Sequence, residues 1–226
     1  METLTAIQKQ YLEQPKERIS GSEAIVRCLL AEGVDILYGY PGGAIMPVYD
    51  ELYKYEDKIN HVLTRHEQCA AHAAQGYARI SGKVGVAMAT SGPGATNLVT
   101  GIADAQIDST PIVCITGQVP SHLLGSDAFQ ETDIVGISTP VTKWNHQVTK
   151  ASQIPEIIAR AFYIAKSGRP GPVLIDITKD AQFEEFDFQY KKCTGVRSYV
   201  PVPKTDDSSV TAAAELINSA KKPLII

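Results

Sequence analysis

The chain has 226 residues, of which 44% are hydrophobic and 20% are charged, and its formal net charge is -4. This composition excludes a disordered chain, a coiled coil and a collagen-like repeat, and the net negative charge gives no electrostatic footprint for binding nucleic acid. No stretch approaches the roughly 18 uninterrupted apolar residues of a membrane span.

Residues 1–17 are polar and contain Pro15, so we expect a flexible lead-in there. This segment lacks the apolar run of a secretory signal. The four cysteines lie far apart and form no Cys-x-x-Cys pair, so neither a zinc site nor a redox pair is indicated. Cys28 and Cys114 lie in apolar runs and are expected to be small core residues. Unpaired cysteines without an export signal predict a cytoplasmic protein.

After this lead-in, helical and strand-like segments alternate along the chain. Ser20 or Ser22 is a candidate N-cap for the first helix, and Gly33 lies just past its end. Apolar positions at helical spacing predict helices over residues 19–33, 41–55, 66–82, 91–107 and 154–168. Apolar, β-rich runs predict strands over residues 34–40, 59–65, 85–90, 111–119 and 171–177.

The last three of these strands are apolar at successive positions, as strands buried on both faces are. Strands that alternate with helices predict an α/β fold, a three-layer parallel sheet with helices on both faces. Ligands of such sheets bind at the carboxyl ends of the strands. Those ends carry the sequences GYPGG, TRHEQ, TSGPGATN, TGQVP and DITKD. We therefore expect this domain to carry a binding site.

The character of the sequence changes after about Asp187. We expect one domain over residues 18–186 and a polar, proline-containing linker over 187–208. An amphipathic helix at 210–220 and the apolar run PLII follow. A helix and half a strand cannot form a core, so residues 209–226 are expected to be the truncated start of a second α/β domain.

Glu67 directly follows a buried strand and opens a helix. A carboxylate at this position can simply favour the positive end of the helix dipole. It can also be a carboxylate in a dry crevice that bonds a ligand nitrogen and shares its proton. The neighbouring His66 and His72 are six residues apart rather than four, so they do not form the zinc-protease motif, and we expect a helix-start residue and an ordinary surface or packed histidine.

Two glycine turns follow strands, YPGGA at 40–44 and SGPGATN at 91–97. Neither completes a dinucleotide fingerprint or a P-loop. Each alone could be a tight strand-to-helix turn, but both together allow a backbone to approach a planar ligand closely.

Three further residues can each be explained without a functional role. Arg169 suits phosphate or a flavin edge, or is a solvated loop arginine. Lys179 could likewise be a solvated loop lysine, and Phe129 could pack within its own loop.

Taken together, these strings are more specific than any one of them. The chain resembles, over about residues 19–185, the N-terminal domain of thiamine-diphosphate enzymes, and among these the catalytic subunit of the acetolactate synthase (acetohydroxyacid synthase) family. The motifs that carry the resemblance are YPGGAIMPVYD, LTRHEQCAAHAAQGYAR, ATSGPGATN, PIVCITGQVP, DAFQETD and GRPGPVLIDITKD.

The resemblance implies roles for individual residues. Glu67 matches the glutamate that bonds the aminopyrimidine of thiamine diphosphate and shares its proton, and Gln130 matches, with Phe129, a substrate-facing pair. The positions that match the pyrimidine-binding side are Tyr40, Pro41, Gly42 and Asn97. The positions that match the substrate channel, where herbicides of this target bind, are Gly43, Ala44, Val119, Pro120, Ala128 and Lys179. Arg169 matches a flavin-contacting arginine.

The resemblance also implies cofactors, substrates and partners. They are thiamine diphosphate, Mg²⁺ and FAD, with pyruvate and a second 2-oxo acid as substrates for decarboxylation and carboligation in valine, leucine and isoleucine biosynthesis. A homodimer or higher oligomer is implied, while binding of a regulatory subunit stays open; neither nucleic acid nor membrane is expected as a partner. The family's GDG metal-diphosphate motif does not occur in this sequence, so no metal ligand is assigned here and the 226-residue chain alone is expected to be inactive.

Two alternatives stay open. One is another thiamine-diphosphate enzyme, such as pyruvate oxidase, glyoxylate carboligase or oxalyl-CoA decarboxylase. Glyoxylate carboligase is disfavoured, because its usual site lacks the glutamate that Glu67 would provide. The other alternative is a non-catalytic interaction module, which would have no need of Glu67, Gln130 and both glycine turns together.

Overall fold

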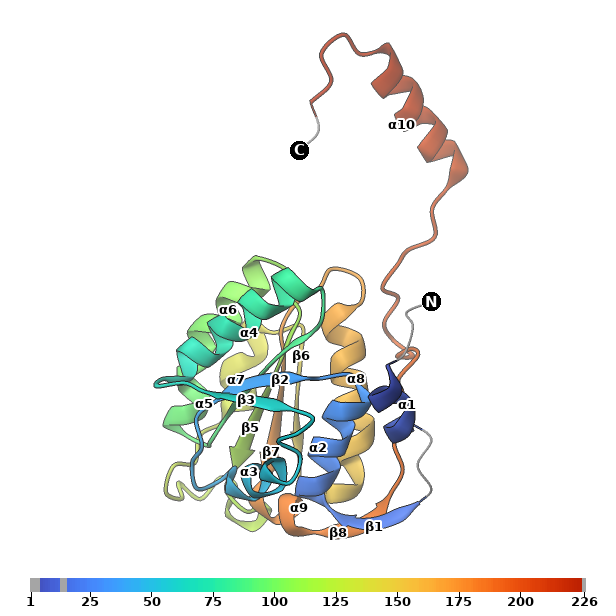
Figure 1. Cartoon of the computed structure of the whole chain (residues 1–226). Helices are drawn as coiled ribbons and strands as arrows, with labels where there is room; N and C mark the ends of the chain where they lie inside the picture. Colours follow the sequence, from blue (N-terminus) through green and yellow to red (C-terminus); the bar gives the residue numbers. More distant parts are fainter. Residues whose placement is uncertain (1–4, 13–15, 225–226) are drawn as a thin grey trace.

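The computed structural model of the chain describes residues 5–12 and 16–224 (Figure 1). Its centre is a six-stranded parallel sheet with the order β3-β2-β4-β5-β7-β6. The strands of this sheet are β2 (Ile36–Gly39), β3 (Asn60–Leu63), β4 (Gly85–Ala89), β5 (Ile112–Gln118), β6 (Trp144–Val148) and β7 (Val173–Thr178). Two short strands, β1 (Glu17–Ser20) and β8 (Glu185–Phe188), form a separate antiparallel pair. The expected α/β fold with a parallel sheet is confirmed.

Helices cover both faces of the sheet. The longer helices are α2 (Gly21–Ala31), α3 (Met46–Tyr53), α4 (Glu67–Ser81), α6 (Val99–Ile107), α8 (Ile154–Lys166) and α10 (Asp207–Ser219). The shorter ones are α1 (Ala6–Leu12), α5 (Pro93–Asn97), α7 (Ile134–Ser138) and α9 (Lys179–Phe183), with 3₁₀ turns at Ser121–Leu123, Thr139–Val141 and Ala151–Gln153. None of the helices in the described ranges combines the length and apolar character that crossing a bilayer requires.

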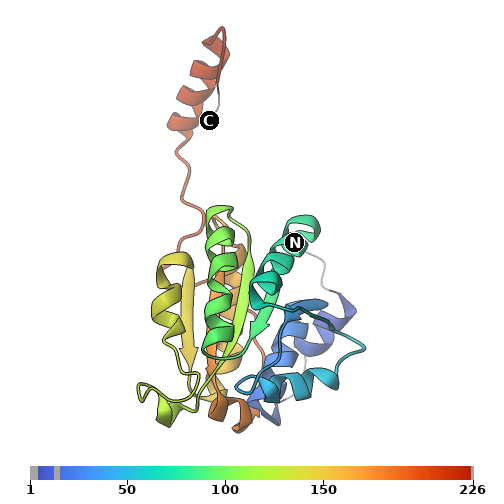
Figure 2. The same cartoon turned by 90° about the vertical axis from the view of Figure 1, so that its left-hand side faces the viewer.

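The sheet separates two hydrophobic cores. Alternate residues of β4 show the division: Val86 and Met88 pack with α2, α3 and α8, whereas Ala87 and Ala89 pack with α4, α5 and α6. Figure 2 shows α4 and α6 side by side on the second face. All residues of β4, β5 and β7 are buried, as their uninterrupted apolar runs predict.

The predicted helix boundaries follow from capping. Ser20 caps α2 and accepts a hydrogen bond from the Glu23 amide at 3.2 Å, and Gly33 follows the helix with a φ of 82°. The segment 91–107 forms two helices rather than one, α5 and α6, which meet at Leu98.

Cys28 and Cys114 are fully buried, which confirms their expected place in the core.

Some elements were not expected from the sequence. Strand β6 lies at an edge of the sheet and four of its five residues are only half-buried, so it lacks the apolar run of a central strand. Strands β1 and β8, with the sequences ERIS and EFDF, each contain two charged residues, so neither has an apolar run. Within the expected lead-in, residues 6–12 form α1, whose Tyr11 belongs to the core next to α2, while residues 1–4 and 13–15 lie outside the described part of the chain.

The segment expected to be a linker packs on the domain over its first half. Phe188 and Tyr190 belong to the core, and the Tyr190 hydroxyl donates to the Glu32 carboxylate at 2.5 Å. The Tyr199 hydroxyl donates to the Ser167 carbonyl at 2.8 Å, and its ring packs edge-on against Tyr163 of α8. Beyond it, every residue of α10 is exposed, and the helix extends away from the sheet (Figures 1 and 2).

A buried polar cluster ends the central strands. The Asp176 carboxylate on β7 accepts hydrogen bonds from Thr116 (2.7 Å) and Gln118 (3.1 Å) on β5 and from Gln147 (3.0 Å) on β6. Asp176 is fully buried, and this burial, with a small contribution from the nearby negative charge of Asp133, raises the pKa of its carboxyl to about 6. The three hydrogen bonds oppose that shift without cancelling it.

Contact between α4 and β4 yields a stability prediction. A Cβ added at Gly85 would lie 2.1 Å from the Ala74 carbonyl oxygen, so Gly85→Ala must separate the helix from the strand. We expect a loss of about 1–3 kcal/mol in the free energy of unfolding, measured by urea denaturation. The matched control is Gly76→Ala on α4, where a Cβ would have nothing within 4 Å. This change should stabilise the protein by about 1 kcal/mol, and equal effects of the two changes would contradict the packing described.

Asp176 yields a pH prediction. Because its folded-state pKa lies above the ordinary value of 3.8, the folded state holds the proton more tightly, and this contribution to stability is lost as the pH rises from about 4 to above 6. Asp176→Asn cannot ionise. We expect its free energy of unfolding to equal that of the parent near pH 4 and to exceed it at pH 7.5, by up to about 3 kcal/mol. Parallel stability profiles of parent and variant over this range would refute it.

Candidate functional site

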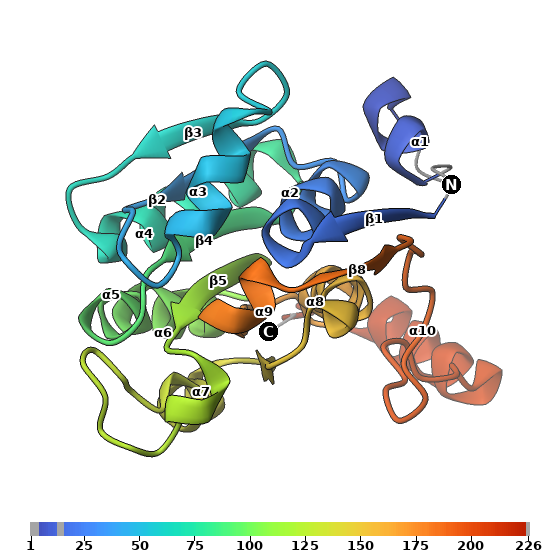
Figure 3. The same ribbon diagram turned by 90° about the horizontal axis from the view of Figure 1, so that it is seen from below.

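The candidate site lies at the carboxyl edge of the sheet, between β2 and β4. These strands are neighbours, yet the chain leaves β2 toward β3 on one side and returns to β4 on the other. Such a reversal of strand order leaves a crevice beyond the carboxyl ends, where open α/β sheets bind ligands. Figure 3 is seen from this edge, with α3, α9 and α7 in the foreground.

Glu67 is the first residue of α4 and is only 7% exposed. The preceding His66 caps the helix by accepting a hydrogen bond from the Gln68 amide on Nδ1 at 3.1 Å, as expected of a helix-start residue. The Asn97 amide at the end of α5 donates to Glu67 Oε2 at 3.0 Å. Within the described residues, no group donates to Oε1. The carboxylate is therefore buried, held on one oxygen, and able to accept a further hydrogen bond on the other.

The two glycine turns meet at Thr90, which follows β4. A Cβ added at Gly42 would lie 2.6 Å from Thr90 Cβ, and one added at Gly94 would lie 2.7 Å from Thr90 Cγ2 and 3.2 Å from Glu67 Oε1. Thr90 Oγ1 also accepts a hydrogen bond from the Ala44 amide at 3.2 Å. The glycines are thus required for close approach, and no pattern in the sequence indicates the part that Thr90 plays.

Tyr49 on α3 is a second residue that the sequence did not indicate. Its hydroxyl is buried and has no hydrogen-bond partner among the described residues. Burial, together with the negative charge of Glu67, raises the pKa of this hydroxyl. A Cβ at Gly39 would lie 2.4 Å from the hydroxyl oxygen, so Tyr49 lies directly against the end of β2. Tyr49 therefore places a neutral, unpaired donor near the carboxylate.

The residues predicted to form the channel wall converge from three elements. The Gln182 amide on α9 donates to the Ala44 carbonyl at 2.8 Å, and a Cβ at Gly117 would lie 2.3 Å from the same oxygen. The Ser121 amide donates to Asp180 at 2.9 Å, which joins the turn after β5 to α9. These contacts bring together the predicted wall residues Gly43, Ala44, Val119, Pro120 and Lys179.

Phe129 and Gln130 lie on the loop between β5 and α7. Phe129 is 88% exposed, so the reading in which it packs within its own loop is wrong. Gln130 is half-buried and has a φ of 59°, and its backbone oxygen would lie 2.6 Å from a Cβ at Gly92. The loop therefore lies against the second glycine turn, with Ala128 beside it, while the exposed Tyr40 and the half-buried Pro41 lie on the first turn.

Arg169 is not brought to this edge. Its guanidinium donates to Ser109 Oγ at 2.7 Å and to the Ile107 carbonyl at 3.1 Å. It therefore caps the C-terminal end of α6, near the amino ends of the strands, from an exposed position in the loop between α8 and β7.

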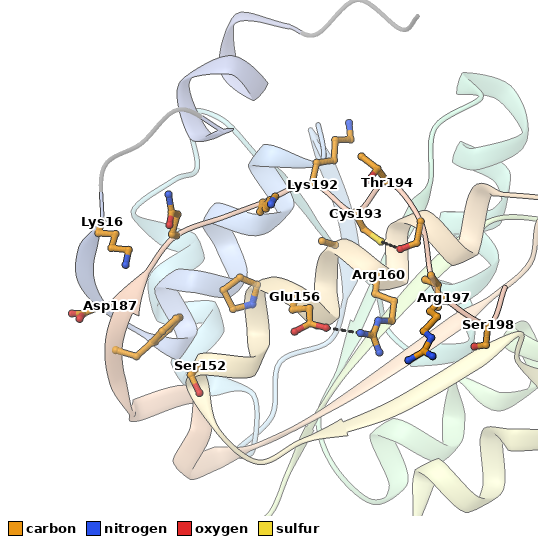
Figure 4. Close-up of a pocket in the computed structure, with 17 residues that line it drawn as sticks. Lys16, Ser152, Glu156, Arg160, Asp187, Lys192, Cys193, Thr194, Arg197 and Ser198 are labelled. Atoms are coloured by element: carbon orange, nitrogen blue, oxygen red, sulfur yellow. Dashed lines mark hydrogen bonds and ion pairs between the residues drawn. The ribbon is translucent and has the colours of Figure 1, made fainter. Parts of the chain in front are cut away.

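A cavity of about 830 Å³ lies elsewhere, between α8 and the segment that follows β8. Figure 4 shows its lining, in which Glu156 pairs with Arg160 on α8, with Arg197 beside Arg160. It includes none of the predicted site residues. Among residues 5–12 and 16–224, no three His, Cys, Asp or Glu side chains are grouped to hold a metal ion.

Comparison with known proteins gives a consistent result. Residues 19–137 match the family model of the thiamine pyrophosphate enzyme N-terminal TPP-binding domain. The chain is 56% identical over 209 residues to the acetolactate synthase large subunit of Corynebacterium glutamicum, covering 92% of this chain and 33% of that protein. It is 53% identical over 211 residues to a probable acetolactate synthase large subunit of Methanococcus aeolicus (92% and 35%) and 50% identical over 217 residues to an acetolactate synthase of Arthrospira platensis (94% and 38%).

The chain thus spans about a third of the length of the relatives that it matches. The family model covers more than half of the chain, including both glycine turns, Glu67 and Asn97. On this evidence the chain belongs to the thiamine pyrophosphate enzymes and carries their N-terminal cofactor-binding domain.

Proposed function

We propose that the chain supplies the pyrimidine-binding half of a thiamine-diphosphate site in an acetolactate synthase. The reaction is decarboxylation of pyruvate and transfer of the remaining two-carbon unit to a second 2-oxo acid, as in branched-chain amino-acid biosynthesis. The observation that carries the proposal is the buried Glu67 carboxylate, held by Asn97 on one oxygen and facing the glycine turns with the other.

These residues fit an aminopyrimidine. A ring of this kind offers a nitrogen acceptor and an amino donor in one plane, and the close approach of both glycine turns to Thr90 leaves backbone rather than side chains on the ligand side. The unpaired Tyr49 hydroxyl is a further buried polar group next to Glu67. The strong resemblance at 40–44 and 91–97 supports Tyr40, Pro41, Gly42 and Asn97 as the cofactor-binding residues.

When bound, thiamine diphosphate supplies the carbanion-stabilising chemistry of the reaction. This chain's part is to hold and share a proton at Glu67 Oε1, because a carboxylate can both hydrogen-bond the ring nitrogen and exchange a proton with it. Burial removes competing water from this bond. Asn97 holds the carboxylate in place through Oε2, so Oε1 keeps its direction.

The substrate side is proposed to be the exposed Phe129 and the half-buried Gln130, with the channel wall that includes Val119 and Lys179. FAD contact by Arg169 stays part of the proposal, although its guanidinium donates to Ser109 and to the Ile107 carbonyl at the end of α6 in this structure. Mg²⁺ ligands, a homodimeric or larger assembly, a regulatory subunit and a cytoplasmic location are expectations from the resemblance and the cysteine pattern. Residues that would hold the metal are not assigned within this sequence.

Exchange of Glu67 for Gln tests the proposal, in the protein at the full length of its relatives. The amide cannot share a proton with the ring nitrogen, so we expect acetolactate formation to fall by a factor of about 10² to 10⁴. The melting temperature should change little, because an amide can still accept from Asn97. The measurement is the steady-state rate with pyruvate, alongside thermal unfolding.

Glu156→Gln is the matched control. Glu156 is also an acid in the first turn of a helix, α8, but its side chain is 74% exposed and it lies away from the site. We expect its turnover to be that of the parent. Unaltered turnover in Glu67→Gln would refute the role of Glu67.

Product analysis separates the proposed reaction from that of sister enzymes. With pyruvate as the sole 2-oxo acid, we expect acetolactate. Acetyl phosphate would indicate a pyruvate oxidase instead. Absence of both products at full length would contradict carboligation and favour an interaction module.

The 226-residue chain by itself is expected to form no measurable acetolactate. The family's GDG motif, which binds the metal and the diphosphate, does not occur in this sequence. The measurement is product formation by the purified chain with thiamine diphosphate, Mg²⁺, FAD and pyruvate. Turnover under these conditions would show that the cofactor can be held without that motif.

A further inference from the structure

The loop of residues 125–132, drawn in yellow-green before α7 in Figure 3, has an unusual backbone. Gly125, Asp127 and Gln130 have φ values of 77°, 57° and 59°. Only three non-glycine residues of the described chain have positive φ, and two of them lie in this loop. Side chains rarely adopt this conformation unless the surroundings impose it. The loop therefore depends on contacts that hold its backbone.

One set of contacts lies within the loop. The Glu131 carboxylate accepts hydrogen bonds from the Gly125 amide and, at 3.0 Å, from the Ala128 amide. These hydrogen bonds lower the pKa of the Glu131 carboxyl, and the bond from the Gly125 amide has the largest effect. This brace closes the loop on itself, but it does not fix the loop relative to the sheet.

Gln118, the last residue of β5, makes the connection to the sheet. It is 1% exposed, and its side-chain amide donates to the Thr132 carbonyl at 2.9 Å and to Asp176 Oδ2 at 3.1 Å. Its side-chain oxygen accepts from the Val119 amide at 2.9 Å. All these contacts are mutually consistent with a single orientation of the amide. One buried side chain thus joins the end of the loop, the start of the channel wall and the neighbouring strand.

We propose that Gln118 is a positioning residue for the reaction, fixing the 125–132 loop so that Phe129 and Gln130 keep their place beside Glu67. The inference rests on the proposed function for its catalytic consequence. Phe129 needs such support because its exposed side chain packs on nothing that could hold it, so its position follows from the backbone alone. Asp176 in turn orients Gln118, because its carboxylate accepts a hydrogen bond from the Gln118 side-chain amide.

The first test is hydrogen exchange on the 226-residue chain, without cofactor or substrate. Gln118→Met keeps the size and burial of the side chain but cannot donate to Thr132. We expect the amides of the 125–132 loop, above all those of Gly125 and Ala128, to exchange about five- to tenfold faster, with no change in β4 and β7. Unchanged exchange in the loop would overturn the proposal.

Gln75→Met is the matched control. Gln75 on α4 is 2% exposed, and its side-chain amide likewise donates to a backbone carbonyl, that of Gly101, at 2.9 Å. The same chemical change there should leave exchange in the 125–132 loop as in the parent. Faster loop exchange in this control would show that any buried glutamine has the effect, and would refute a specific role of Gln118.

If Gln118→Met does not fold, Gln118→Asn replaces it in the exchange test. It keeps a buried amide but is one methylene shorter, so it loses the reach to Thr132. The same rise in loop exchange is expected, and unchanged exchange would again overturn the proposal.

The second test is kinetic, in the protein at the full length of its relatives. We expect Gln118→Met to raise KM for the 2-oxo acid about tenfold or more, with the dissociation constant of thiamine diphosphate unchanged. Equal weakening of cofactor binding would indicate a general structural defect and overturn the positioning role. Failure of the proposed function is recognised separately, because the parent would then form no acetolactate while the exchange result would stand.

Discussion

The close approach of two backbone turns over Thr90 is the constraint on which the rest of the site depends. Gly42 and Gly94 touch Thr90 from opposite turns, and Thr90 holds the first turn through the Ala44 amide. Because Gly94 also adjoins Glu67 Oε1, a side chain at position 94 would fill the space in front of the carboxylate. Glu67 Oε1 thus stays open to a ligand because position 94, directly beside it, carries no side chain.

The sheet makes that approach reproducible. Strands β4, β5 and β7 are buried on both faces, so a one-residue shift of any of them would move its side chains into the opposite core. On β4 this would exchange Val86 and Met88 with the smaller Ala87 and Ala89. The carboxyl ends of these strands therefore have little freedom to move, and the residues that follow them are held in defined positions. The Asp176 cluster adds a polar connection across β5, β6 and β7 at the same edge. The burial of the Asp176 carboxylate is unfavourable, but the carboxylate orients the side-chain amides of Gln118 and Gln147.

Much of this could be predicted from the sequence, because the signals are local. Apolar runs identified the central strands, Ser20 and Gly33 marked the ends of α2, and the motifs at the strand ends identified the family. What could not be predicted depends on contacts between distant segments. The environment of Tyr49, the role of Thr90 and the capping of α6 by Arg169 follow from packing that a local pattern does not encode. Edge strand β6 was missed for a related reason, since half-burial leaves no continuous apolar run.

The site therefore combines two kinds of support. Glu67 and Asn97 are held by helices that start or end at the sheet edge, so their positions follow from the same burial that stabilises the fold. Phe129 and Gln130 stand on a strained loop, and their positions follow from a few hydrogen bonds to Glu131 and Gln118. A bond of this kind contributes only about 1 kcal/mol, far less than the burial of a strand. The proposed cofactor side is thus the rigid part of the site, while the proposed substrate side is the part that a single side-chain amide can alter.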